Sequence, residues 1–207
     1  MKTLLSVFVC LFLLSCSEEN KIAVKATFEN YQTAILNDNG QAAFKNIDKK
    51  TREYYSWASK SAKELDEKAI KALGFMDKMM ILLIRQRVSR SDVLKMDGKA
   101  LFIYAVENGW VGKNGVSQLS IGDISVNNNF ATGVVLNNNQ KSPLKFHFYK
   151  EDQLWKIDLT EISKWGEAMF VSQQKKSGKT MDEYILLLVQ IVSKKPVDLS
   201  TIYKPLI

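Results

Sequence analysis

Cysteine, histidine and proline are scarce in this chain of 207 residues, which has two cysteines, one histidine and three prolines. Metal centres built from cysteine and histidine need several of these ligands close together, so we expect none. The acidic residues show no calcium-loop spacing, and the sequence has no glycine-rich phosphate loop. The sequence therefore predicts neither a bound metal nor another cofactor.

Long apolar runs are also missing, apart from a short one at residues 4–14. A helix that spans a bilayer needs about 20 apolar residues, which this run does not reach. Lys2 precedes the run and Ser15 follows it. A cationic start, a short apolar core and a small residue before the cleavage site are typical of a secretory signal peptide. We therefore expect residues 1–15 to be removed and the protein to be exported.

The four residues 13–16, Leu-Leu-Ser-Cys, resemble the end of a bacterial lipoprotein signal. The resemblance implies that Cys16 becomes the first mature residue and carries diacylglyceryl and acyl chains such as palmitate. Stable anchoring needs more than one acyl chain, which this class supplies. Cys10 lies in the segment removed, so the mature chain has no partner for a disulfide. In the same class, the Ser17 that follows favours sorting to the outer membrane.

Residues 16–21 form the expected lipidated N-terminus and tether. Five extended residues reach at most about 18 Å, so the folded part is expected to lie close to its membrane. The formal net charge is +7, with the lysines spread along the chain. We interpret this charge as a solvated surface, with attraction to anionic lipid headgroups as the alternative. An exported protein is not expected to bind nucleic acid.

Helical periodicity begins after the tether, where Val24, Phe28, Tyr31 and Ile35 form one apolar stripe. Residues 79–84 are apolar on every side, which predicts a helix through the centre of the fold. Thr180 and Glu183 have the spacing of a capping box. The predicted helices span about 24–35, 43–47, 54–65, 66–73, 75–88, 101–106, 162–169 and 180–192. The segment 101–106 is also compatible with a strand.

Four segments rich in β-branched and aromatic residues predict strands at 117–126, 130–136, 143–150 and 154–160. The loops between them are short, which favours an antiparallel meander. Phe146 and Phe148 alternate with polar residues, so we expect them to face the core and His147 to face away. Helices followed by a meander and further helices predict an α+β fold.

Three stretches, 31–44, 50–55 and 150–159, resemble bacterial envelope proteins with a nuclear transport factor two-like domain. The resemblance covers about residues 22–161. It implies a cone in which a curved antiparallel meander sheet wraps the N-terminal helices around a pocket. Residues 162–207 are then a C-terminal helical extension packed on the same domain. The fold hosts isomerases, dehydratases and binding modules, so it implies no single activity.

Aromatic residues at helical spacing are the candidate pocket lining, with ordinary core packing as the alternative. They are Tyr31, Tyr54, Trp57 and Tyr104. Enzymes of the resembling family use an aspartate or histidine as acid or base, and His147 and Asp158 are the candidates here. Strand alternation places both on the polar face of the sheet, which favours a solvated or structural role over a catalytic one.

The leading hypothesis is therefore a non-enzymatic envelope lipoprotein that binds a partner protein, the membrane surface or an apolar ligand. The alternative is a small-molecule isomerase or dehydratase working in the cone. The oligomeric state stays open.

Overall fold

The structure is a computed structural model that describes residues 3–110 and 113–207. Within this range, the side chains of residues 3–17 and of residue 114 are outside the description. The predicted lipid attachment at Cys16 and the whole predicted signal peptide, residues 1–15, therefore lie outside the described side chains.

The chain forms two compact units, each built from two separate segments. The sheet unit comprises residues 1–48 and 103–159, and the helical unit comprises residues 49–102 and 160–207. The C-terminal helices therefore group with residues 49–102, whereas the sequence had placed residues 22–161 together. The chain passes between the units at three points.

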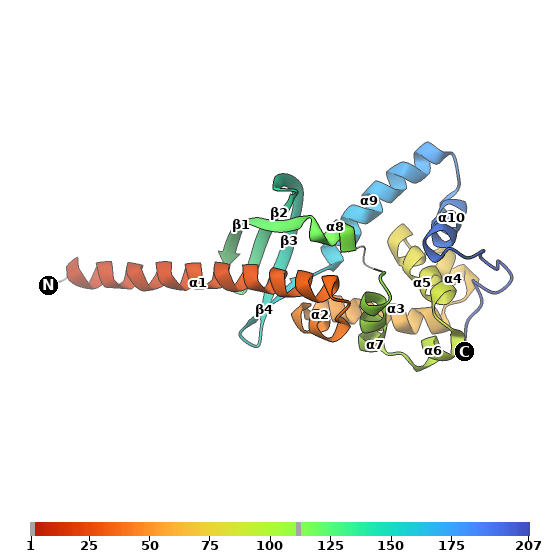
Figure 1. The fold of residues 1–207 in the computed structure, drawn as a ribbon, viewed down its shortest axis with the longest axis horizontal. Helices are drawn as coiled ribbons and strands as arrows, with labels where there is room; N and C mark the ends of the chain where they lie inside the picture. Colours follow the sequence, from red (N-terminus) through yellow and green to blue (C-terminus); the bar gives the residue numbers. More distant parts are fainter. Residues whose placement is uncertain (1–2, 111–112) are drawn as a thin grey trace. The chain divides into compact units, whose positions relative to one another are not determined.

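In the sheet unit, helix α1 lies across one face of a four-stranded antiparallel sheet with strand order β1-β2-β3-β4 (Figure 1). Each strand pairs with the next along the chain, which confirms the predicted meander. The helices that belong to this unit, or enter it, are α1 (Thr3–Leu36), α2 (Gly40–Asn46), α7 (Gly98–Glu107) and α8 (Lys113–Ser117). The strands are β1 (Leu119–Asn127), β2 (Phe130–Asn137), β3 (Gln140–Glu151) and β4 (Leu154–Asp158).

The core of the sheet unit forms where α1 meets the sheet. The predicted apolar stripe of α1 is buried, and the rings of Phe28 and Phe146 lie 5.3 Å apart. Phe146 and Phe148 are buried as their alternation predicted, whereas His147 between them is half-buried. The tight turns use residues with positive φ, such as Asn128, which is a conformation that asparagine tolerates.

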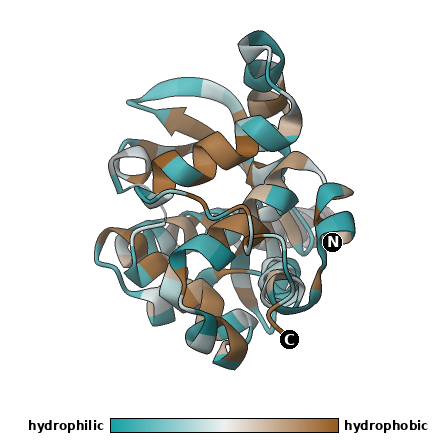
Figure 2. Cartoon of the chain, turned by 90° about the vertical axis from the view of Figure 1, so that its right-hand side faces the viewer, coloured by the Kyte–Doolittle hydropathy of each residue, from teal (hydrophilic) through white to brown (hydrophobic). Residues whose placement is uncertain are grey.

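The helical unit is built around α5 (Phe75–Arg87). Ile81, Leu82, Leu83 and Ile84 are all buried, as predicted for the apolar stretch 79–84, whereas Met79 and Met80 are half-buried. The other helices of this unit are α3 (Lys49–Glu64), α4 (Glu67–Lys71), α6 (Arg90–Lys95), α9 (Thr160–Ser177) and α10 (Met181–Ser193). In Figure 2 many helices carry both brown apolar and teal polar residues, as amphipathic helices do.

The α+β class is confirmed, and apart from the grouping into two units the differences described next are local. Residues 101–106 lie in helix α7, so the strand alternative is wrong. Strand β3 begins at Gln140, before the predicted start, and contains Pro143. Proline has no backbone N–H to donate. It is tolerated here because the β2–β3 register shifts between Val134 and Leu136, which leaves Pro143 outside the paired residues.

Candidate functional site

His147 and Asp158, the predicted acid–base candidates, are cross-strand partners in β3 and β4. Register partners share a face of the sheet, so both lie on the face opposite to Phe148. The His147 ring packs edge-on against Phe130 at 5.3 Å. Asp158 is fully buried, so this part of the expected polar face is not open to water. Strand alternation assigns a side chain to a face, but it does not say whether that face is covered.

The four predicted pocket aromatics divide between the two units. Tyr31 is buried in the core of the sheet unit, which was the alternative left open by the sequence. Tyr104 on α7 packs edge-on against Trp110, with the ring centroids 6.0 Å apart. Tyr54 and Trp57 lie on α3 of the helical unit, and both line a hollow there.

We call this hollow the aromatic pocket; its volume is about 610 Å³. The rings of Tyr54 and Trp57 lie 5.5 Å apart and form its aromatic wall. Their spacing on α3 places both side chains on one face of that helix. The lining residues are Lys50, Glu53, Tyr54, Trp57, Met76, Asp77, Thr160, Ser163, Lys164 and Glu167.

A hydrogen bond joins two polar groups of this pocket: the Tyr54 hydroxyl donates to Asp77 Oδ1 at 3.1 Å. Burial raises the pKa of the Asp77 carboxyl above its usual range, and this is the largest cause. The pKa of Tyr54 is also raised, first by burial and then by the nearby Asp77 charge. Tyr54 therefore remains a protonated donor, and Asp77 keeps Oδ2 as a further acceptor.

Glu167 of α9 fixes the pocket wall by capping α5. The backbone N–H groups of Phe75 and Met76 each donate to its carboxylate at 2.8 Å. Gly74, the residue at the N-cap position of α5, has no side chain that can accept these bonds. Sequence reasoning missed Glu167, because its partners lie about 90 residues away. One hint was present in the sequence: Gly74, just before α5, has no side chain to cap the helix, so another residue has to do so.

The rim of the pocket is charged but largely paired. Glu161 lies 2.6 Å from the Lys164 ammonium and 3.4 Å from that of Lys50. These contacts, led by the bond from Lys164, lower the pKa of the Glu161 carboxyl. The arrangement therefore combines an apolar aromatic wall, a partly buried hydrogen bond between Tyr54 and Asp77, and a rim of mixed charge.

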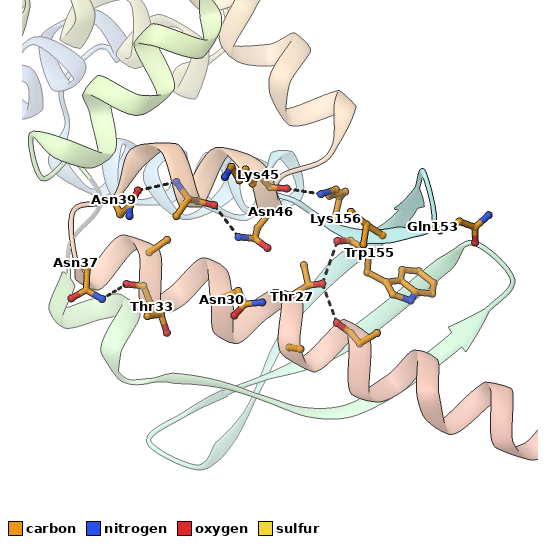
Figure 3. Close-up of a pocket in the computed structure, with 15 residues that line it drawn as sticks. Thr27, Asn30, Thr33, Asn37, Asn39, Lys45, Asn46, Gln153, Trp155 and Lys156 are labelled. Atoms are coloured by element: carbon orange, nitrogen blue, oxygen red, sulfur yellow. Dashed lines mark hydrogen bonds between the residues drawn. The ribbon is translucent and has the colours of Figure 1, made fainter.

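A second hollow of about 600 Å³ follows α1 in the sheet unit, and we call it the α1 groove (Figure 3). Its lining is rich in alanine, asparagine and threonine. Much of the polar lining bonds to nearby backbone. The Thr27 hydroxyl contacts the carbonyl oxygens of Ala23 at 3.0 Å and Trp155 at 3.2 Å, and the Asn37 amide donates to the Thr33 carbonyl. The groove therefore offers a ligand fewer uncommitted groups than its composition suggests.

Among the helices of the described residues, none is both long enough and apolar enough to cross a membrane. No family model, no curated protein and no solved structure matches this chain, so its function is inferred from the chemistry of its own residues.

Proposed function

We propose that this protein is an exported, lipid-anchored envelope protein whose helical unit binds a small apolar molecule without transforming it. The observation that carries the proposal is the aromatic pocket, where Tyr54 and Trp57 face a common hollow beside the Tyr54–Asp77 hydrogen bond. Its volume of about 610 Å³ lies within the range of small-molecule sites in proteins.

The lining supports a ligand with a flat apolar body and one hydrogen-bond donor. Trp57, Tyr54 and Met76 offer aromatic and thioether surface against which such a body packs. Asp77 Oδ2 is an acceptor at the edge of this surface, where a ligand N–H or O–H completes the bonding of the carboxyl. A few placed polar groups within an apolar lining are the usual basis of orientation and specificity in binding sites.

Binding without chemistry is favoured by what the pocket residues already do. The Tyr54 hydroxyl donates a hydrogen bond to Asp77, and the Glu167 carboxylate accepts hydrogen bonds from the N-terminus of α5. His147 and Asp158, the candidates for the isomerase or dehydratase alternative, belong to the sheet unit and are not part of the pocket lining.

The anchor part of the proposal rests on residues 13–16 and their resemblance to a lipoprotein signal. The sheet unit, with α1 across a four-stranded meander, is compatible with the proposed nuclear transport factor two-like cone. In this view the sheet unit connects the lipid anchor at Cys16 to the ligand-binding helical unit along the chain.

Native mass spectrometry of the full lipoprotein, released gently from its own membranes, tests ligand binding. We expect the wild-type protein to retain a small molecule and Trp57→Ala to lose it. Trp165→Ala is the matched control, because Trp165 is 49% exposed on α9 and does not line the pocket. Equal ligand occupancy in the wild type and Trp57→Ala, or a bare wild-type protein, would reject the proposed pocket function.

A further inference from the structure

The middle of α1 is bonded to the β3–β4 hairpin by the side chain of Asn20. Asn20 Oδ1 accepts hydrogen bonds from Trp155 Nε1 at 3.1 Å and from the Lys150 ammonium at 3.2 Å. The same ammonium lies over the Trp155 ring, 5.8 Å from its centroid. Asn20 follows the proposed lipidation residue, Cys16, by four positions in one continuous helix. The hairpin is therefore tied to the chain immediately after the anchor.

Because residues 16–20 are helical, Cys16 and Asn20 lie only a short distance apart along the helix axis. Four residues of helix rise about 6 Å, whereas an extended tether of the same length would reach more than twice as far. The headgroup layer of one leaflet is about 5–8 Å deep. With acyl chains of Cys16 in the hydrocarbon region, Asn20 and the hairpin bonded to it lie at the membrane surface, and a tilt of α1 brings them closer.

Two large apolar side chains are exposed on the segments that contain Asn20 and the β3–β4 turn. Ile22 on α1 is 67% exposed, and Leu154, which follows the β3–β4 turn, is 60% exposed. The charges nearby are balanced, since Lys21 lies 3.2 Å from Glu18 and Lys25 lies 3.8 Å from Glu29. Apolar contact, rather than attraction to anionic headgroups, is what this surface can supply.

The strands of the meander end in turns at two opposite ends of the sheet. We call the end closer to Cys16 along α1 the near edge and the opposite end the far edge. The β1–β2 and β3–β4 turns share the near edge, where the Lys150 N–H donates to the Asn129 carbonyl at 2.8 Å. The β2–β3 turn, next to Gln140, lies at the far edge. Gln32, about 18 Å further along α1 than Asn20, donates to the Leu119 carbonyl at the far end of β1.

We propose that the near edge of the sheet unit is a second membrane contact, in which Leu154 and Ile22 enter the headgroup layer beside the lipidated Cys16. This inference rests on the proposed lipid anchor and deepens it. The contact converts a flexible attachment into a defined orientation, with the far edge and the β2–β3 turn pointing away from the bilayer.

A fluorescent label at each edge tests the orientation. The mature chain keeps only Cys16, so Leu154→Cys and Gln140→Cys each introduce a single free thiol for a nitrobenzoxadiazole label. The full lipoprotein carrying either label is reconstituted into phosphatidylcholine vesicles. We expect the label at position 154 to shift to the blue and gain intensity several-fold, and the label at position 140 to keep its aqueous spectrum.

Three results would overturn the inference in distinguishable ways. Equal aqueous spectra at both positions, on protein that carries the acyl mass and floats with vesicles, would reject the second contact and leave the anchor intact. A shift at position 154 that requires phosphatidylglycerol would replace apolar insertion with charge attraction. Absence of the acyl mass at Cys16, with no flotation, would reject the anchor and the contact together.

Discussion

Lys78 places an ammonium group inside the helical unit. The residue is only 2% exposed, and its Nζ lies 2.6 Å from Asp182 Oδ1. Removing the carboxylate leaves a buried charge without its partner, which costs more than removing the charge itself. We expect Asp182→Ala to lower the free energy of unfolding by about 1–3 kcal/mol in urea titrations, because Asp182 is partly exposed and water compensates in part.

Lys78→Met is the matched variant for this prediction. Methionine keeps the apolar stem of the side chain and needs no counter-charge, so we expect a loss of less than about 1.5 kcal/mol. A Lys78→Met variant that is less stable than Asp182→Ala would show instead that the ion pair itself is strongly stabilising.

At the level of single residues, the sequence singled out Tyr54 and Trp57 as possible lining of a pocket in the cone. The structure places both at a hollow in the helical unit instead. Asp77 and Glu167 were not singled out, because their roles depend on α3, α5 and α9 meeting in space. Tyr31 shows the limit of helical spacing as a signal, since such spacing describes a buried face and a pocket-lining face equally well.

Among the elements, α10 begins with a complete capping box. The Thr180 hydroxyl accepts from the Glu183 N–H at 3.3 Å, and the Thr180 N–H donates to Glu183 Oε2 at 2.8 Å. This confirms the prediction made from their spacing. We expect Thr180→Ala to lose about 1 kcal/mol of unfolding free energy, measured by chemical denaturation. A change close to zero would mean that packing alone determines where α10 begins.

The same cap predicts a dependence on pH. Bonds from the backbone N–H and then the hydroxyl of Thr180 lower the pKa of Glu183 below its ordinary value of 4.5. A lowered folded-state pKa stabilises the protein above that ordinary value, and the contribution is lost as pH falls through the folded pKa. We expect Glu183→Gln to be less stable than wild type at pH 7 and the difference to shrink below about pH 4.

Thermal unfolding at several pH values measures this difference. Glu107→Gln is the control, because Glu107 is an exposed carboxylate that starts no helix. A difference in melting temperature between wild type and Glu183→Gln that stays constant down to pH 3 would contradict the assigned role of the Glu183 carboxylate.

Element boundaries were predictable where the chain supplies a local signal. The meander follows from four β-rich segments joined by short polar turns, and the start of α10 follows from its cap. The start of β3 was not predictable, because Pro143 argues against a strand unless the register shift opposite Val134 is known. Pairing with β2 decides this boundary, because the register shift places the unpaired residues 142–144 within β3 only once both strands are in place.

In the molecule as a whole, the grouping of helices depends on contacts that are distant in sequence. Phe75 at the start of α5 stacks on Phe170 of α9, with centroids 5.4 Å apart and planes 6° from parallel. It also packs against Tyr184 of α10 at 6.1 Å. The resemblance to a single-domain cone led us to expect residues 49–102 to pack with the sheet. Nothing in their local pattern indicates that they pack instead with the segment after residue 160.

A truncation tests this grouping. Removing residues 160–207 leaves every segment of the sheet unit but takes α9 and α10 from the helical unit. We expect the shortened chain to keep its β-sheet signal in circular dichroism and to bind anilinonaphthalene sulfonate strongly, because apolar residues of α5 such as Phe75 become exposed. Removing only residues 205–207 should not produce this effect. Unchanged dye binding after the long truncation would contradict the grouping.

The interleaved order of the two units has a consequence for how such a protein is made and inherited. No contiguous stretch of the gene encodes either unit, so a recombination event cannot move one of them intact into another protein. During synthesis or export, the first segment of each unit waits for its second segment to emerge. The search for partners so far apart in the chain slows folding, which lengthens the time in which apolar segments are open to chaperones and proteases.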